Sequence, residues 1–144
     1  MDRFSLIDGV NVYYVTLTIL DWLPVFINPE PTQIIVDSLQ YCIKEKGLRI
    51  NAYVIMPNHL HMIVFDRKFD NDHLQHTLAD FRKFTGRKLA DYIVNNLSES
   101  LATVIRRKEL EDRDRQVWQP SWHAEGLVSE HFWKQKMDYI HQNP

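Results

Sequence analysis

Hydrophobic and polar positions along the first third of the chain predict a strand followed by a helix. Residues 10–19 (VNVYYVTLTI) are β-branched or aromatic almost throughout, which is typical of a central strand. A helix is predicted from the Pro29 and Pro31 pair to about Lys46, where Gly47 ends it. The apolar positions of this helix recur at helical spacing: Ile35, Leu39, Cys42 and Ile43.

A hairpin is predicted next. Residues 48–56 and 59–65 are both rich in apolar and β-branched side chains, and the pair Pro57 and Asn58 between them is a turn signal. We therefore expect two antiparallel strands.

The rest of the chain is predicted to be mostly helical. A long helix is expected over residues 72–95, with Gly86 as a possible bend, followed by a weaker, charge-rich helix over residues 98–115. One side of the long helix is apolar: Leu74, Leu78, Phe81, Leu89 and Ile93. Residues 117–128 suit a loop with one short strand, and Ser129 begins a final helix.

The order of elements favours an α+β fold. Strand, helix, two strands and helix match a ferredoxin-like antiparallel sheet with helices packed on one face. A chain of 144 residues with 44% hydrophobic content is sufficient for one domain, residues 1–144, around a single core.

Charge and cysteine content narrow the possible classes. The formal net charge of −2 gives no overall sign of nucleic-acid binding, and the single cysteine, Cys42, excludes a disulfide framework. We find neither a signal peptide nor an apolar run near the roughly 20 residues of a membrane span. The expectation is a cytoplasmic protein without membrane contact.

The strand after the turn contains two histidines, in the segment MPNHLHMIV. Side chains alternate along a strand, so His59 and His61 should share one face, opposite an apolar set consisting of Leu60, Met62 and Val64. Two adjacent imidazoles suit a transition metal, and with oxygen ligands also magnesium. A purely structural role, with one ring exposed and the other bonded to a carbonyl, remains open. A histidine-triad hydrolase is excluded, because Ile63 stands where that class needs a third histidine.

The final helix has two distinct faces. Trp133, Met137 and Ile140 follow helical spacing and should be its buried stripe. Lys136, Tyr139 and Asn143 share a different face, which presents an amine, a phenol and an amide. The alternative for these three is an ordinary solvated face.

These motifs together resemble a known family. MPNHLHMIV and the C-terminal DYIHQNP are similar to the single-tyrosine HUH transposases, most closely their REP-associated tyrosine transposase branch. The segments YYVTLTI, FRKFTGRKL and WQPSWH fit that branch in order and spacing, so the resemblance covers nearly the whole chain. It implies the HUH endonuclease fold and a metal-dependent enzyme that cuts and rejoins single-stranded DNA at hairpins or repeat ends.

The resemblance also implies roles for individual residues. His59 and His61 match the HUH metal ligands, Tyr139 the nucleophile that forms a 5′-phosphotyrosine, and Asn143 the third ligand of Mg²⁺ or Mn²⁺. From its helical phase, Lys136 is expected to stabilise charge on the phosphate. The family continues beyond its NP motif, so a short C-terminal extension is expected to be missing. Related branches form homodimers that exchange the tyrosine helix, so a homodimer is possible here.

DNA contacts are expected from basic clusters. The long helix has four basic residues, Arg82, Lys83, Arg87 and Lys88, for which we predict contact with single-stranded or hairpin DNA, hence association with the nucleoid. A second group, Arg106, Arg107 and Lys108, is interpreted as a solvated face. Trp118 and Trp122 are candidates for stacking on bases or for anchoring a loop. Two other functions remain open: a DNA-binding module without cleavage, and a metal-dependent phosphoesterase.

Overall fold

The computed structural model describes residues 10–96, 117–120 and 122–142. Two short 3₁₀ turns, η1 (Leu20–Trp22) and η2 (Val25–Ile27), follow the first strand. The main elements in chain order are β1 (Tyr13–Thr18), α1 (Pro29–Lys46), β2 (Leu48–Met56), β3 (His59–Asp66), α2 (Asn71–Asn96), β4 (His123–Gly126) and α4 (Glu130–Gln142). The helix predicted over residues 98–115 and the basic group at 106–108 lie outside the described residues.

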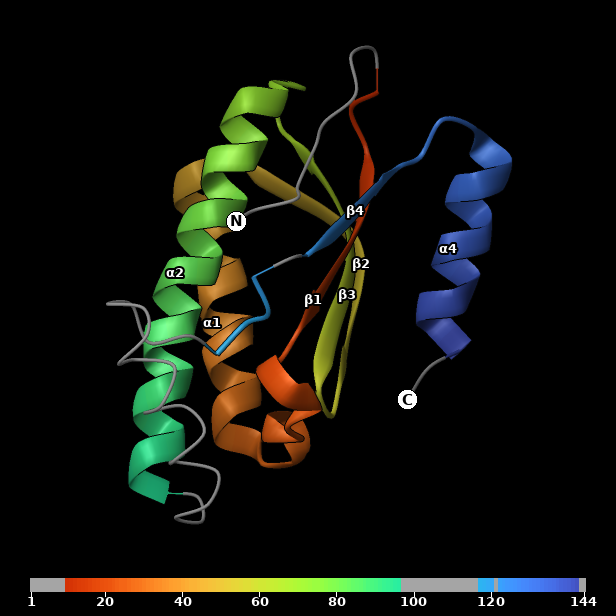
Figure 1. The fold of residues 1–144 in the computed structure, drawn as a ribbon. Coiled ribbons are helices and arrows are strands. Elements are labelled where there is room, and N and C mark those ends of the chain that lie inside the picture. The colour runs from red at the N-terminus through yellow and green to blue at the C-terminus, as the bar shows by residue number, and fades with distance from the viewer. Residues whose placement is uncertain (1–9, 97–116, 121, 143–144) are drawn as a thin grey trace.

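The sheet has the strand order β2-β3-β1-β4, and every neighbouring pair is antiparallel (Figure 1). With α1 between β1 and β2 and α2 between β3 and β4, this is the predicted ferredoxin-like arrangement. The prediction of an antiparallel α+β fold is therefore confirmed. The hairpin at residues 57–58 and the short strand within 117–128 are confirmed as well.

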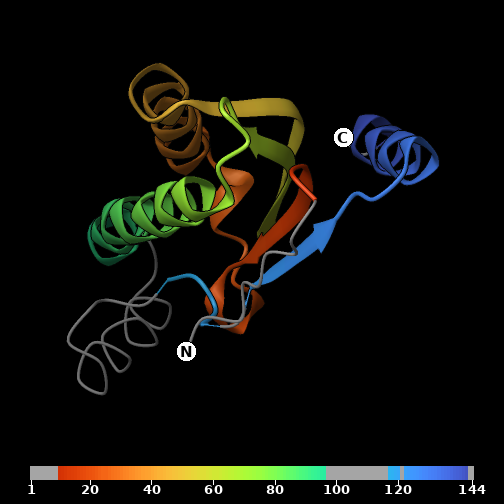
Figure 2. The same cartoon turned by 90° about the horizontal axis from the view of Figure 1, so that it is seen from above.

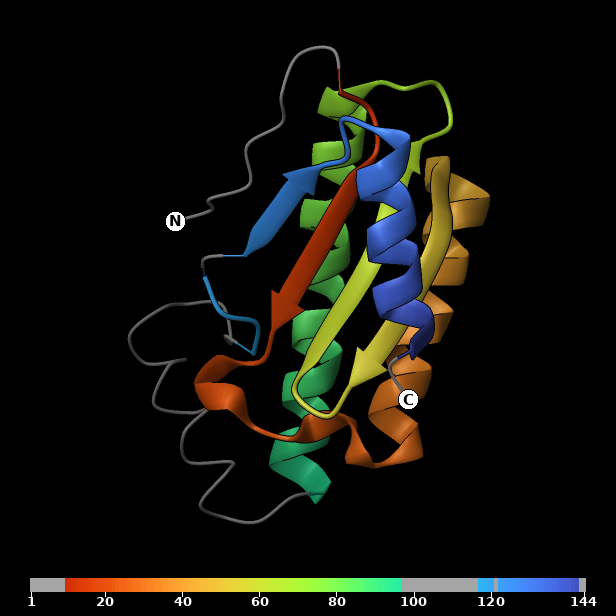
Figure 3. The ribbon, with the colours of Figure 1, turned by 90° about the vertical axis from the view of Figure 1, so that its right-hand side faces the viewer.

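The helices form two layers around this sheet. Helices α1 and α2 pack together on one face, whereas α4 lies across the other (Figures 1 and 2). Seen from that second side, α4 runs over β2 and β3 (Figure 3). The final helix thus occupies the face that is left free by the main core.

Strand β3 separates the two layers. Its side chains Leu60, Met62 and Val64 have no exposed surface and belong to the main core under α1 and α2, as the alternation predicted. The intervening side chains turn toward α4, where a smaller apolar cluster contains Ile63 and Ile140. The predicted stripe of α2, at residues 74, 78, 81, 89 and 93, is buried in full.

Strand β2 contains a bulge at Asn51. Ile50 pairs with Val64, but Ala52 already pairs with Ile63, so one residue of β2 has no partner in β3. The bulge reverses the alternation: Leu48 and Ile50 pack with the main core, and Ala52 packs with the α4 cluster.

Two sequence-based boundaries need correction. Strand β1 begins at Tyr13 rather than at Val10, because the Val10 carbonyl accepts hydrogen bonds from the side chains of Tyr13 and Asn71 instead of a strand partner. Ile43, expected in the buried stripe of α1, is 39% exposed at the edge of the sheet. The other three stripe residues are buried.

Gly47 and Gly86 play different roles in the helices. Gly47 ends α1 in the left-handed conformation with φ of 73°, as predicted. Gly86 does not interrupt α2, which runs unbroken from Asn71 to Asn96 and places Gly86 against Trp118. No helix within the described part of the chain is both long and apolar enough to span a membrane.

These two glycines give a matched pair of substitutions with opposite expected effects. Gly47→Ala should lower the free energy of unfolding by about 1–2 kcal/mol, because a left-handed backbone strains a residue with a Cβ. Gly86→Ala should raise it by up to about 1 kcal/mol, because alanine favours a helix interior and its Cβ would lie 3.7 Å from Trp118 Cδ1, an ordinary contact. Urea unfolding monitored by circular dichroism measures both. A destabilised Gly86→Ala protein would contradict the packing described for α2.

Candidate active site

Two neighbouring strands position the histidine pair. Strand β1 runs antiparallel to β3, so Thr16 lies opposite His61 and Thr18 opposite His59 on the α4 side of the sheet. The two imidazole rings meet edge to face, with their centroids 4.5 Å apart. Both rings therefore point into one small region, as the alternation along β3 predicted.

A hydrogen bond to Nδ1 orients each imidazole. The His61 Nδ1 atom is 2.9 Å from the Thr16 hydroxyl oxygen. The His59 Nδ1–H donates to the Asn58 side-chain oxygen at 2.6 Å, while the amide nitrogen of Asn58 donates to the Trp22 carbonyl. Because an amide oxygen only accepts, neutral His59 has its proton on Nδ1 and a lone pair on Nε2. This is how metal-binding histidines are commonly oriented.

Burial keeps both rings neutral. His61 is 8% exposed, and burial, followed by the proximity of His59 and Lys136, lowers its pKa from 6.5 to about 4. Burial also lowers the pKa of His59. At neutral pH both imidazoles are free bases, which is the form that binds a metal ion.

Helix α4 brings Tyr139 to this pair. Its ring stands edge-on to that of His61, with 5.6 Å between the centroids, and the side chain is 49% exposed. A half-exposed tyrosine beside the neutral imidazole of His61 is accessible to a large substrate. Residues about 80 positions apart in the sequence thus form a single cluster.

Tyr14, Glu125 and Lys136 surround the cluster. The Tyr14 ring stacks on His61 with 5.3 Å between centroids, and the Lys136 ammonium lies 4.6 Å from the centroid of the Tyr14 ring. Lys136 also forms an ion pair with Glu125 at 3.4 Å. Burial, followed by the nearby Tyr139 and Glu125, raises the pKa of Tyr14 to about 12, so its phenol stays protonated.

The remaining residues predicted for the site are distributed differently. Asn143 lies outside the described residues, so the structure gives it no position. Lys83, Arg87 and Lys88 lie on α2, in the layer on the far side of the sheet from the histidines (Figure 1). Arg82 donates to the Gln119 carbonyl and stacks over Trp122, so it helps to hold these two residues against α2.

The two tryptophans act as anchors. Trp118 and Trp122 are each 4% exposed, and the Trp118 indole donates to the Thr85 hydroxyl. With their rings buried in the main core, they have no face available to a nucleobase. Of the two roles considered for them, anchoring is the one that this burial supports.

Two imidazoles are the groups of the cluster that could bind a metal ion. With both Nδ1 atoms engaged, the Nε2 atoms of His59 and His61 are the ligands that the cluster offers. Within the described ranges, no group of three or more His, Cys, Asp or Glu side chains is arranged so that it could hold a metal ion. The donor set fits a divalent ion that takes its other ligands from an amide, from water or from a substrate oxygen.

Several residues of the cluster were missed by sequence reasoning. Tyr14 and Thr16 alternate on β1 with the core residues Tyr13, Val15 and Leu17, so the same period-two argument that was applied to the histidines would have found them. Glu125 offers no such signal. Its proximity to Lys136 depends on the pairing of β4 with β1 and on the placement of α4.

Comparison with family models and with curated proteins gives no match. Among solved structures, the chain is similar to a REP-associated tyrosine transposase bound to a REP hairpin, with a TM-score of 0.58 and 16% identity. The similarity covers 99% of this chain and 70% of that one. The chain has the fold of this transposase. A candidate transposase from Deinococcus radiodurans R1 gives a TM-score of 0.49 and 20% identity, over 98% of this chain and 96% of that one.

In this transposase fold, the burial of His61 has a measurable consequence for stability. Its folded-state pKa of about 4 lies below the ordinary 6.5, so between these values the unfolded chain binds a proton that the folded chain does not. Burial of His61 therefore carries no proton-linked cost above pH 6.5, and the free energy of unfolding falls as the pH drops from 6.5 toward 4, by up to about 1.4 kcal/mol per pH unit. Urea unfolding with a chelator at pH 4.5–7.5 should show this slope reduced in His61→Phe, which keeps a ring against Tyr14. Equal slopes in both proteins would contradict a buried neutral His61.

Proposed function

We propose that this protein is a single-stranded DNA strand transferase of the REP-associated tyrosine transposase kind. It would cut and rejoin DNA through a covalent bond between Tyr139 and a 5′ phosphate. The observation that carries the proposal is the contact between the Tyr139 and His61 rings, because it places a half-exposed phenol beside a pair of imidazoles that burial favours in the neutral form. The fold supports it, and the similar transposase is bound to a REP hairpin, which makes hairpin DNA the substrate class to test.

The proposed cofactor is a divalent ion, Mg²⁺ or Mn²⁺. The Nε2 atoms of His59 and His61 would hold it, with Asn143 as the third protein ligand. When bound, such an ion acts as a Lewis acid that offsets the charge of the scissile phosphate. The contribution of this chain is to present two imidazoles in fixed orientations, which the hydrogen bonds to Thr16 and Asn58 provide.

Tyr139 performs the covalent step. Its phenol oxygen forms a bond to phosphorus and releases its proton to solvent, and the bond from phosphorus to the 3′ oxygen of the preceding sugar breaks. That oxygen gains a proton and leaves as a 3′-OH. Because one phosphodiester replaces another, a second 3′-OH can reverse the step and join strands without a nucleotide cofactor.

Lys136 would act on the phosphate from the same helix. Its ammonium is held between Glu125 and the ring of Tyr14, one helical turn before Tyr139. A DNA phosphate close to Tyr139 offers Lys136 a second anion, and the transition-state charge would strengthen that interaction. Lys136 is therefore proposed as an electrostatic residue, with Glu125 as its partner in the free protein.

The basic residues of α2 would contact DNA away from the cleaved bond. Lys83, Arg87 and Lys88 lie on the layer opposite the histidines, so they would reach only a strand or hairpin that continues around the molecule. Acting on chromosomal DNA would place the protein at the nucleoid. A homodimer that exchanges the tyrosine helix remains a prediction.

Removal of a histidine should weaken metal binding. We expect His59→Ala to weaken Mn²⁺ binding by at least about tenfold, because one of two oriented imidazole ligands is lost. Isothermal titration of Mn²⁺ into the protein measures this, and His131→Ala, an exposed histidine on α4, is the matched control. If His59→Ala binds Mn²⁺ as the parent protein does, the histidine pair has only a structural role.

Removal of one oxygen should abolish the covalent intermediate. Tyr139→Phe keeps the ring against His61, so the free energy of unfolding and the affinity for hairpin DNA should change little, whereas the protein–DNA adduct should disappear. Denaturing electrophoresis of labelled hairpin DNA with Mg²⁺ or Mn²⁺ detects the adduct. Tyr53→Phe, an exposed tyrosine on β2, is the matched control and should form the adduct normally.

Other outcomes of that experiment identify the alternatives. Hairpin binding without an adduct in any of the proteins would indicate a DNA-binding module. Cleavage that is unchanged in Tyr139→Phe would indicate a hydrolase that uses water. An adduct that persists in Tyr139→Phe would overturn the assignment of α4 as the helix that holds the nucleophile.

A further inference from the structure

Helix α4, which presents Tyr139, has a small apolar attachment to the sheet. Ile140 is its one buried residue, and it packs in a cluster with side chains of β1, β2 and β3: Tyr14, Ala52, Val54 and Ile63. Trp133 and Met137 are only partly buried against this cluster. Apolar burial has no preferred direction, so this contact holds the helix on the sheet without fixing its rotation.

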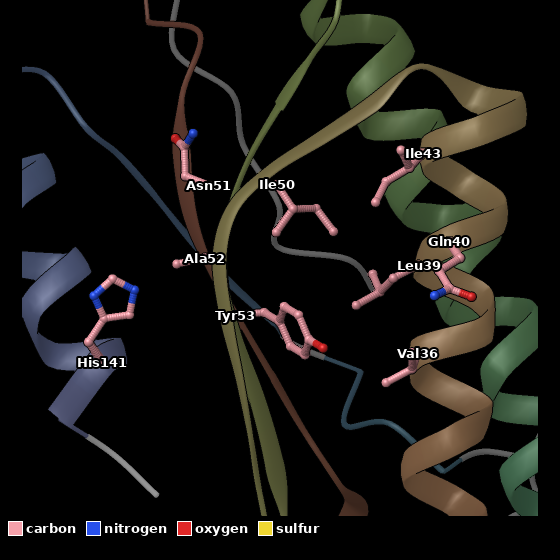
Figure 4. Close-up of a pocket in the computed structure, with 9 residues that line it drawn as sticks. All are labelled: Val36, Leu39, Gln40, Ile43, Ile50, Asn51, Ala52, Tyr53 and His141. Carbon is pink, nitrogen blue, oxygen red and sulfur yellow. The ribbon is translucent and has the colours of Figure 1, made fainter.

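A directional contact comes from the bulge in β2. Asn51 and Ala52 are consecutive, yet both extend toward α4, whereas Ile50 and Tyr53 extend toward α1 (Figure 4). The Asn51 side-chain oxygen accepts a hydrogen bond from the Trp133 indole N–H at 3.1 Å. Because Ile50 lies on the main-core side, the alternation of the strand places Asn51 on the α4 side, and the bulge leaves Ala52 on that side as well.

A second directional contact lies at the other edge of the sheet. Strands β2 and β4 are the two edge strands, and Glu125 on β4 binds Lys136. Trp133 and Lys136 are three residues apart, so they occupy neighbouring positions on α4. Trp133 is held by one edge strand of the sheet and Lys136 by the other. A rotation of α4 that moved Tyr139 away from His61 would break both contacts.

We propose that Asn51 is a positioning residue: its hydrogen bond to Trp133 fixes the rotation of α4 and thereby sets Tyr139 beside His61. Trp133 is six residues before Tyr139, about 9 Å along the helix, so the bond acts on the N-terminal half of α4 while Ile140 anchors the C-terminal half. The effect of Asn51 on the rotation of α4 does not depend on any reaction. The effect of Asn51 on catalysis rests on the function proposed above.

The test combines two substitutions in a double-mutant cycle. Asn51→Ala removes the acceptor, and Trp133→Phe removes the N–H donor but keeps an aromatic ring. Each should speed hydrogen exchange of the α4 amides by about two- to tenfold, the range expected for the loss of one hydrogen bond. The double variant should exchange no faster than either single variant, because both remove the same bond.

Two further variants separate this bond from general packing. Asn51→Asp retains an oxygen acceptor, so it should exchange like the parent protein. Gln40→Ala removes an exposed amide from α1 in the pocket that Asn51 also lines, and it should change nothing (Figure 4). The proposal would be overturned if the single variants exchanged at the parent rate. It would also be overturned if the rate increase in the double variant were the product of the increases in the two single variants.

Adduct formation provides the catalytic measurement. With hairpin DNA and Mn²⁺, Asn51→Ala should form the Tyr139 adduct about two- to tenfold more slowly at unchanged DNA affinity, and Asn51→Asp should restore the rate. A parent protein that forms no adduct but shows the expected exchange pattern would refute the function and leave the positioning role standing. Normal adduct rates together with unchanged exchange would refute the positioning role alone.

Discussion

The alternation of side chains along β3 is the constraint on which the rest of the structure depends. Leu60, Met62 and Val64 fill the main core without any exposed surface, so the strand cannot slip by one residue without placing imidazoles there. The energy of that core therefore fixes the direction of His59 and His61. The histidines owe their placement to the burial of their neighbours, and the hydrogen bonds to Thr16 and Asn58 then set the rotation of each ring.

Burial of the histidines has opposite consequences for stability and for ligand chemistry. Removing His61 from water disfavours its charged form, so the folded protein gives up a proton-binding site that the unfolded chain retains. The same desolvation leaves the ring as a neutral base with a free lone pair, which a protonated imidazole lacks. A more exposed histidine pair would reduce the free energy of unfolding less at acidic pH, but protons would then compete more strongly with a metal ion for the imidazoles.

Sequence patterns predicted what depends on local periodicity. They identified α1, α2, the hairpin, the shared face of His59 and His61, and a final helix with Tyr139. They could not identify the bulge, because Ile50, Ala52 and Val54 are spaced as if they shared one face, and only the pairing with β3 shows that Ile50 faces the other way. The role of Arg82 was equally hidden, because its partners Gln119 and Trp122 lie about 40 positions further along the chain.

The two halves of the cluster differ in how firmly they are held. The histidines lie on β3, a central strand paired on both sides, whereas Tyr139 lies on a helix with one buried side chain and two polar contacts at the sheet edges. Elements with little buried surface open at low cost, while central strands open only with the whole fold. This asymmetry suits the strand transfer proposed above. In that reaction the histidine pair would stay fixed through cleavage and rejoining, whereas Tyr139 would first approach the phosphate and later, linked to DNA, admit an incoming 3′-OH.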